Sequence, residues 1–275
     1  MELSMTLTAR LLGIAVVLAG VGCGVYLLGK SLQDETTSVE GVALLPNHAE
    51  GVFPFLFVPS DRVTDPRTLD AIDAGMVEVS DWYFSQTGRR FVLHPAQKFA
   101  GKAETLDYCV RPDSTVCQQA IPTVDLTPGF DKSLILQELF DGGVPWLGDI
   151  VIVVFFVGGE GLAYGGAGSA ILGDWAIDGL LGTYESVGVN NGCERSANPF
   201  ALCTRNAQLG AVAHELGHAF GLPHPQDDGL PPADANYWRK SVMSSPWEFP
   251  NVVFLETTVN SEKSKLLTGR YLTSE

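Results

Sequence analysis

The stretch DIVIVVFFVGG, from Asp149 to Gly159, predicts the central strand of a β-sheet. After Asp149 it is an uncharged run of β-branched and aromatic residues, which is typical of a strand that is covered on both faces. A second apolar run, VFPFLFV from Val52 to Val58, predicts another buried strand. Its Pro54 cannot donate a backbone hydrogen bond, which favours an edge strand or the start of a strand.

Helices and shorter strands are expected around these two runs. A helical repeat that ends at Gly88 predicts one long helix, capped by Thr64 or Asp65. Its apolar positions are Leu69, Ile72, Met76, Val79 and Tyr83. RRFVLHP, from Arg89 to Pro95, predicts a further strand, and the residues from Asp131 to Phe140 predict a short helix.

A glycine-rich segment, AYGGAGSAILGDWAI, follows the Asp149–Gly159 run. It is compatible with an edge strand whose backbone a ligand approaches closely, and also with a flexible loop, which the composition alone favours. Strands and helices alternate along the chain without internal repeats. The sequence therefore predicts an α/β fold with a mixed sheet and helices packed on it.

The amino-terminal region differs from the rest of the chain. LLGIAVVLAGVGCGVYLL, from Leu11 to Leu28, is uncharged and just long enough to cross a bilayer, so it is either a membrane anchor or a removed signal peptide. Lipidation of Cys23 is a minor alternative. The mostly polar residues from Ser31 to Glu50 indicate a tether. We therefore expect an export segment (1–30), a tether (31–51) and a folded domain (52–275).

Charge and cysteine content bear on partners and location. Seventeen basic and thirty-two acidic residues give a net charge of −15, which would repel nucleic acid and anionic membrane surfaces. Two local cysteine pairs follow the export segment, Cys109 with Cys117 and Cys193 with Cys203. They favour disulfides and a secreted or membrane-anchored domain outside the cytoplasm, although the sequence leaves three pairings open.

The segment HELGHAFGLPH, from His214 to His224, carries the candidate chemistry. On a helix that begins near Thr204 or Arg205, His214 and His218 lie one turn apart and can bind one ion. A continued helix would carry His224 about 9 Å further along the axis. The helix must therefore end before His224, and Gly221 permits that ending.

The donor set of His214, His218 and His224 predicts a catalytic zinc ion, because three imidazoles leave one tetrahedral position open for water. Zinc is favoured over iron, since the dioxygen-activating iron site has two histidines and one carboxylate. Glu215 is then placed to accept the proton of an attacking water and to pass it to the departing amine. The opposite face of the helix should pack on the sheet; it consists of Leu209, Val212, Leu216 and Phe220.

The segment matches, without substitution, the zinc signature H-E-x-x-H-x-x-G-x-x-H, and the chain thereby resembles the metzincin clan of metalloendopeptidases. The resemblance implies a metzincin-like zincin: a mixed twisted sheet with long packed helices, an active-site helix at a cleft and a smaller C-terminal subdomain. It also implies zinc-dependent hydrolysis of internal bonds in a peptide or protein substrate. Met243, in SVMSSPW, matches the methionine turn that lies beneath the zinc site in this clan.

The resemblance extends to the substrate cleft. By position, Pro246, Trp247 and Phe249 would line the pocket for the side chain that follows the cut. An ordinary turn with aromatic packing explains these three residues equally well. The segment Gly165–Gly173 would be the edge strand that binds extended substrate. No tyrosine follows Met243 closely, and the subfamily is left unassigned.

Two other classes of function are compatible with the same residues. A non-catalytic, zinc-stabilised surface binding module would keep the histidines but would not need Glu215. A narrow-substrate zinc amidohydrolase would have a closed pocket in place of an open cleft. Asp227, Asp228 and Asp234 follow the motif, but they form no recognised calcium loop, so a solvated loop is expected there.

Overall fold

The computed structural model describes residues 50–108, 130–145, 149–159, 161–166, 168–183, 204–227, 238–256 and 261–273. The predicted export segment, almost all of the predicted tether and every cysteine lie outside these residues. The predictions of an anchor or signal peptide, of lipidation and of disulfides therefore stay predictions. Within the described ranges, no helix has both the length and the apolar character needed to span a membrane.

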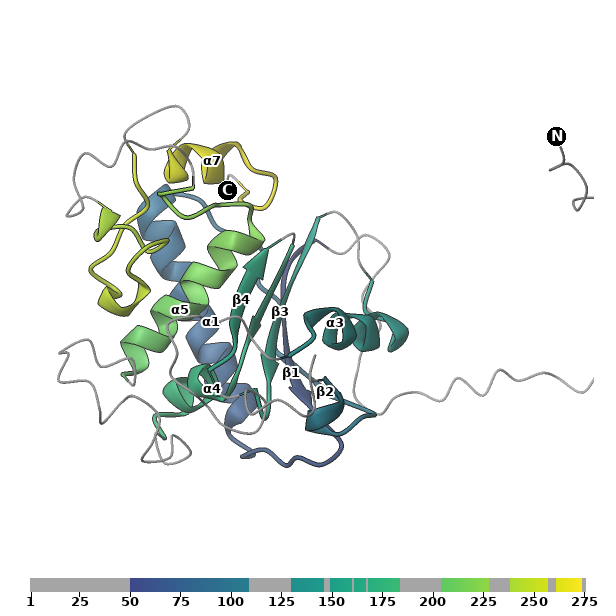
Figure 1. Ribbon diagram of the computed structural model, residues 1–275. Helices are drawn as coiled ribbons and strands as arrows, with labels where there is room; N and C mark the ends of the chain where they lie inside the picture. The colour runs from purple at the N-terminus through teal and green to yellow at the C-terminus, as the bar shows by residue number, and fades with distance from the viewer. Residues whose placement is uncertain are drawn as a thin grey trace, which may run out of the picture. The chain divides into compact units, whose positions relative to one another are not determined.

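Five strands form one mixed sheet in the order β2-β1-β3-β5-β4 (Figure 1). The strands are β1 (Gly51–Val58), β2 (Gln97–Ala100), β3 (Ile150–Phe156), β4 (Ala163–Gly166) and β5 (Ser169–Leu172). All neighbours run parallel except β4, which is antiparallel to β5 and forms one edge. β3 is central in the sheet and buried along its whole length, which confirms the prediction for the Asp149–Gly159 run.

β1 (Gly51–Val58) is an inner strand although it contains Pro54, so the edge-strand alternative of the prediction is wrong. On the β2 side, Val52 donates to Val92 O and accepts from the amide of His94. Peptide groups two residues apart on a strand point to the same side, so the nitrogen of Pro54 also faces this side. There β2 pairs with β1 only from Phe55 onward. The proline therefore occupies a position where the ladder needs no donor.

Helices cover both faces of the sheet and give three layers (Figure 1). The helices are α1 (Thr68–Thr87), α3 (Lys132–Asp141), α4 (Asp174–Leu181), α5 (Arg205–Ala219) and α7 (Glu262–Thr268), with 3-10 turns η1 (Thr105–Tyr108) and η2 (Pro246–Glu248). α1, α4 and α5 pack on one face of the sheet, and α3 packs on the other. Alternate side chains of β3 enter the two cores, as the strand period requires.

α1 follows its predicted apolar repeat, and its buried residues include Ile72, Met76, Val79 and Tyr83. It ends at Gly88, whose φ of 68° is the left-handed conformation that terminates a helix. It begins at Thr68, later than predicted. Asp65 Oδ1 accepts from the amide of Arg67, and this turn precedes the helix.

The predictions for two further segments have different outcomes. The residues from Arg89 to Pro95 form no strand, and only Arg90 and Leu93 make single bridges. Pro95 has no amide to donate, and the ladder with β1 starts beyond it, at Gln97. The glycine-rich segment, for which composition alone favours a loop, supplies β4 and β5. β4 lies at an edge of the sheet, which agrees with the edge-strand alternative.

Asp178, on α4, is a buried carboxyl group. Its Oδ2 has no hydrogen-bond partner within the described part of the chain. Burial, together with the charge of nearby Asp174, raises the pKa of Asp178 to about 7. The folded protein therefore keeps this acid neutral over a pH range in which the unfolded chain ionises it.

We expect Asp178→Asn to stabilise the protein at pH 8 relative to the parent, but not at pH 4. Because the folded-state pKa is raised, the contribution of the acid is fully present below about pH 4 and is lost as the pH rises through about 7. The difference in unfolding free energy should therefore grow across this window, by roughly 1–3 kcal/mol. Urea unfolding of both proteins at a series of pH values measures it, and a difference independent of pH would contradict the role of Asp178.

Candidate metal centre

α5 presents two of the three predicted ligands. It begins at Arg205, within the predicted range, and Thr204 caps it by accepting a hydrogen bond from the amide of Ala207. His214 and His218 lie one turn apart, with ring centroids separated by 4.6 Å. The predicted apolar face is buried in the core through Leu209, Val212 and Leu216. The helix is thus held by one face while two histidines meet on another.

The chain turns back after α5 and brings in the third predicted ligand. α5 ends at Ala219, and Gly221 has a φ of 92°. The amide of Gly221 donates to His218 O, which closes the end of the helix. His224 Nε2 then lies 3.1 Å from His218 Nε2. The helix therefore breaks between these two histidines, as the spacing requires.

The three Nε2 atoms converge on one point. His218 Nε2 lies 3.1 Å from the Nε2 of both His214 and His224. Two nitrogens bound at about 2.0–2.1 Å around a tetrahedral zinc ion would be about 3.3 Å apart. Among the described residues, these three form a group whose ligand atoms all lie within 4.8 Å of one another. Their geometry therefore fits a single metal ion.

Two of the rings are held through their other nitrogen by backbone carbonyls. His214 Nδ1 lies 2.9 Å from Val242 O. His218 Nδ1 lies 2.6 Å from Leu222 O. Because a carbonyl oxygen can only accept, both Nδ1 atoms carry the proton, and both Nε2 atoms turn a lone pair toward the common point. The backbone therefore sets the tautomer that a metal needs.

The third ring has a carboxylate partner. His224 Nδ1 lies 3.3 Å from Asp227 Oδ2, and both side chains are exposed to solvent. A carboxylate beside the outer nitrogen of a ligand histidine is a common arrangement in metal sites. From the sequence, Asp227 is expected to lie in a solvated loop without a role. In the structure its carboxylate instead contacts a candidate ligand. Asp228 and Asp234 lie outside the described residues.

Burial controls the charge of the site. Burial, followed by the neighbouring histidines, lowers the pKa of His214 to about 3. Burial also lowers the pKa of His218. Both rings are therefore neutral near pH 7, as a metal ligand must be. Burial raises the pKa of Glu215, between these ligands in sequence, to about 7. A carboxyl group with this pKa can both accept and return a proton near neutral pH.

Met243 packs against the helix that carries the histidines. Its side chain is fully buried. A Cβ atom on Gly217 would lie only 2.4 Å from Met243 Sδ, so the glycine leaves the space that the sulfur fills. The preceding residue, Val242, supplies the carbonyl that holds His214. The turn around Met243 therefore lies directly against the candidate metal centre.

The three predicted pocket residues lie on or beside η2, next to the first half of α5. A Cβ atom on Gly210 would lie 1.8 Å from Pro246 O, so η2 can pack this closely on α5 only because residue 210 is glycine. Phe249 is buried, and its ring centroid lies 5.3 Å from that of Trp82. Trp247 keeps an exposed side chain. Pro246 and Trp247 are thus near the helix surface, whereas Phe249 belongs to the core.

β4 lies against the turn of α5 that carries Glu215. A Cβ atom on Gly165 would lie 2.1 Å from Glu215 O and 2.7 Å from His218 Cβ. Just before β5, the amide of Gly168 donates to Ala219 O. The glycines therefore allow a close approach by α5, whereas the edge-strand alternative of the sequence analysis expected a ligand at that place. The glycines in the sequence indicate that something approaches this backbone closely, but they do not show that it is α5.

Gly221→Ala is expected to weaken metal binding. Gly221 and Gly88 have φ values of 92° and 68°, and an added Cβ would meet nothing within 4 Å at either position. Each Ala variant should lose about 1–2 kcal/mol of stability through left-handed backbone strain. Only Gly221 lies between His218 and His224, so only its variant should bind zinc more weakly, by about tenfold or more. Chelator competition measures this, and equal zinc affinities for the two variants would contradict it.

Known proteins give little further guidance. No protein-family model matches the sequence, and no curated protein matches it either. Solved structures of OgpA from Akkermansia muciniphila are similar in part. One wild-type crystal form has 14% identity, a TM-score of 0.47 and coverage of 80% of this chain and 60% of OgpA. A second form has 15% identity, a TM-score of 0.41 and coverage of 64% and 49%.

A third OgpA structure is of the catalytic inactive protein in complex with an O-glycopeptide (glycodrosocin) substrate. It has 15% identity, a TM-score of 0.39 and coverage of 66% of this chain and 51% of OgpA. This chain therefore spans between about half and three-fifths of the length of OgpA. A likeness at this level assigns neither a family nor a substrate to the chain.

Proposed function

We propose that this chain is a zinc-dependent endopeptidase of the metzincin type, with residues 52–275 as its catalytic domain. The observation that carries the proposal is the convergence of three histidine Nε2 atoms at the end of α5, with Glu215 directly after the first of these ligands in the sequence. Three imidazole ligands leave a position open on a tetrahedral ion, as catalytic zinc sites do and closed structural sites do not. The free carboxyl group next to the first ligand supports hydrolysis over a purely structural role.

The residues of the chain divide the chemistry between them. His214, His218 and His224 would hold zinc, which when bound polarises a carbonyl group and lowers the pKa of water. Glu215 takes the proton of the water that attacks the peptide carbonyl, and then gives it to the departing amine. One water is consumed, and Glu215 returns to its starting state. Its pKa of about 7 suits both transfers.

The substrate would bind as an extended peptide along β4. β4 is one edge of the described sheet, and Gly165 allows it to lie against the turn of α5 that bears Glu215 and His218. A peptide that adds to this edge as a further strand would therefore run beside the metal centre. Trp247, exposed near the first half of α5, would contact the side chain that follows the cut.

The catalytic domain would act outside the cytoplasm, either secreted or held by the segment from Leu11 to Leu28. The uncharged length of that segment and the paired cysteine spacing support this location. Added protease should digest the domain on intact cells that express the full chain. Protection until the cells are lysed would contradict the proposed location.

Incubation of the full-length protein with a broad library of unstructured peptides, followed by mass spectrometry of the products, tests the proposed activity. We expect cuts at internal bonds that disappear with a zinc chelator and return when zinc is added. Cleavage restricted to amides of small molecules would favour a narrow-substrate amidohydrolase instead. Zinc binding without any cleavage would favour a binding module.

A further inference from the structure

Glu262 is a buried acidic residue outside the ligand set. It is the first residue of α7 and is 2% exposed. Ser241 Oγ lies 2.6 Å from Glu262 Oε1 and 2.8 Å from Oε2, and donates its proton to this carboxylate. The amide of Leu255 donates to Oε2 over 2.9 Å. These donors compensate for the burial of a charged group, which would otherwise be strongly unfavourable.

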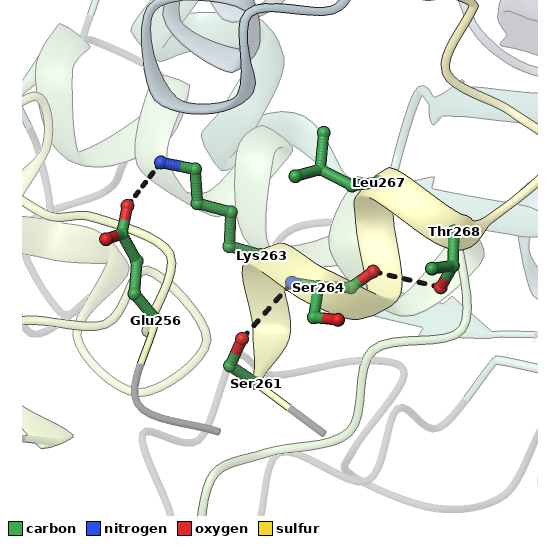
Figure 2. Close-up of a pocket in the computed structure, with 6 residues that line it drawn as sticks. All are labelled: Glu256, Ser261, Lys263, Ser264, Leu267 and Thr268. Atoms are coloured by element: carbon green, nitrogen blue, oxygen red, sulfur yellow. Dashed lines mark hydrogen bonds and ion pairs between the residues drawn. The ribbon is translucent and has the colours of Figure 1, made fainter. Parts of the chain in front are cut away.

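The start of α7 is fixed on its outer side as well. Figure 2 shows Ser261, whose hydroxyl accepts from the amide of Ser264, and Lys263, which forms an ion pair with Glu256. These residues line a surface pocket of about 290 Å³ that includes none of the histidines. The pocket therefore does not belong to the metal centre, but its contacts anchor the helix from which Glu262 enters the interior.

Ser241 connects Glu262 to the turn beneath the candidate metal centre. Ser241 Oγ accepts a hydrogen bond from the amide of Met243 over 3.0 Å. Between these two residues is Val242, whose carbonyl oxygen lies 2.9 Å from His214 Nδ1. Ser241, Val242 and Met243 are all fully buried. A continuous set of buried hydrogen bonds therefore runs from Glu262 to the backbone that holds the first ligand.

We propose that Glu262 is a positioning residue for His214. By binding Ser241 and Leu255 at once, its carboxylate fixes the turn 241–243 in the conformation in which Val242 O meets His214 Nδ1. Glu262 touches neither metal nor substrate and acts only through these intervening groups. Supporting partners of this kind tune metal sites because they orient the ligand ring. The inference rests on the proposed metal site.

The zinc affinity of full-length Glu262→Gln, Ser241→Ala and the double variant, measured by chelator competition, tests this role. Each single variant should bind zinc about 10–100-fold more weakly than the parent. The double variant should be little worse than the weaker single variant, because both changes break the same hydrogen bond. Cobalt-loaded variants should also show a changed visible spectrum, which reports ligand geometry and does not follow from lower stability alone.

Thr87→Val is the matched control, because Thr87 is buried and donates to Tyr83 O at the end of α1. It should lower stability without changing zinc affinity. If the parent binds zinc and both test variants bind it equally well with an unchanged cobalt spectrum, the role of Glu262 is wrong while the proposed function stands. If the parent binds no zinc, the metal site itself is overturned. If Glu262→Gln does not fold, Ser241→Ala alone decides.

Discussion

Glu215→Gln is expected to reduce peptide cleavage by about 10²–10⁴-fold while leaving the zinc content unchanged. Glutamine has nearly the same shape as glutamate but cannot accept the proton of the attacking water. Glu215 is not one of the three candidate metal ligands, so its replacement should leave zinc binding intact. Initial cleavage rates and metal analysis of the same samples measure both effects.

Glu78→Gln is the matched control for this variant. Glu78 forms a surface ion pair with Arg205, and Arg205 lies on α5, the helix that also carries Glu215. Replacing Glu78 therefore also removes a carboxylate that contacts α5. Its cleavage rate should stay close to that of the parent, since an exposed ion pair contributes little. Retained activity in Glu215→Gln, or equal losses in the two variants, would remove Glu215 from the proposed mechanism.

Gly165→Ala is expected to impair stability and cleavage together. The added Cβ would lie 2.1 Å from Glu215 O and 2.7 Å from His218 Cβ, far inside van der Waals contact. Such overpacking costs about 1–3 kcal/mol, and β4 must move away from α5 to relieve it. Because a displacement of about 1 Å can lower a rate 10²-fold, cleavage of extended peptides should fall by about that factor.

Gly166→Ala provides the comparison for Gly165→Ala. A Cβ on Gly166 would meet only the ring end of Tyr164, at 3.1 Å from its hydroxyl oxygen. Both variants replace a glycine of the same strand, so the effect of alanine on the strand itself is shared. Cleavage rates and urea unfolding should therefore separate them. Equal rates for the two variants would show that the approach of β4 to α5 is unimportant for activity.

The metal centre could be predicted from the sequence because its signals are local. The interval from His214 to His218 places two rings on one helical face, and Gly221 shows where the helix must end before His224. Thr204 marks the start of the same helix. The central strand could be predicted for a similar reason, since an uncharged β-branched run is compatible with few other environments.

The remaining features depend on contacts between distant parts of the chain, which local patterns do not encode. Pro54 is tolerated inside the sheet because β2 begins to pair only at Phe55. Phe249 is buried because Trp82, on α1, lies beside it. The support of His214 depends on Val242 and Glu262, which no spacing rule connects to the histidine motif.

The central claim is that His214, His218 and His224 bind one catalytic zinc ion, and elemental analysis tests it most directly. The full-length protein would be loaded with zinc, freed of excess metal and compared with His218→Ala treated in the same way. We predict about one zinc per parent chain, and strongly reduced zinc in the variant, because two ligands cannot complete the site. No zinc in the parent, or equal zinc in both proteins, would contradict the account.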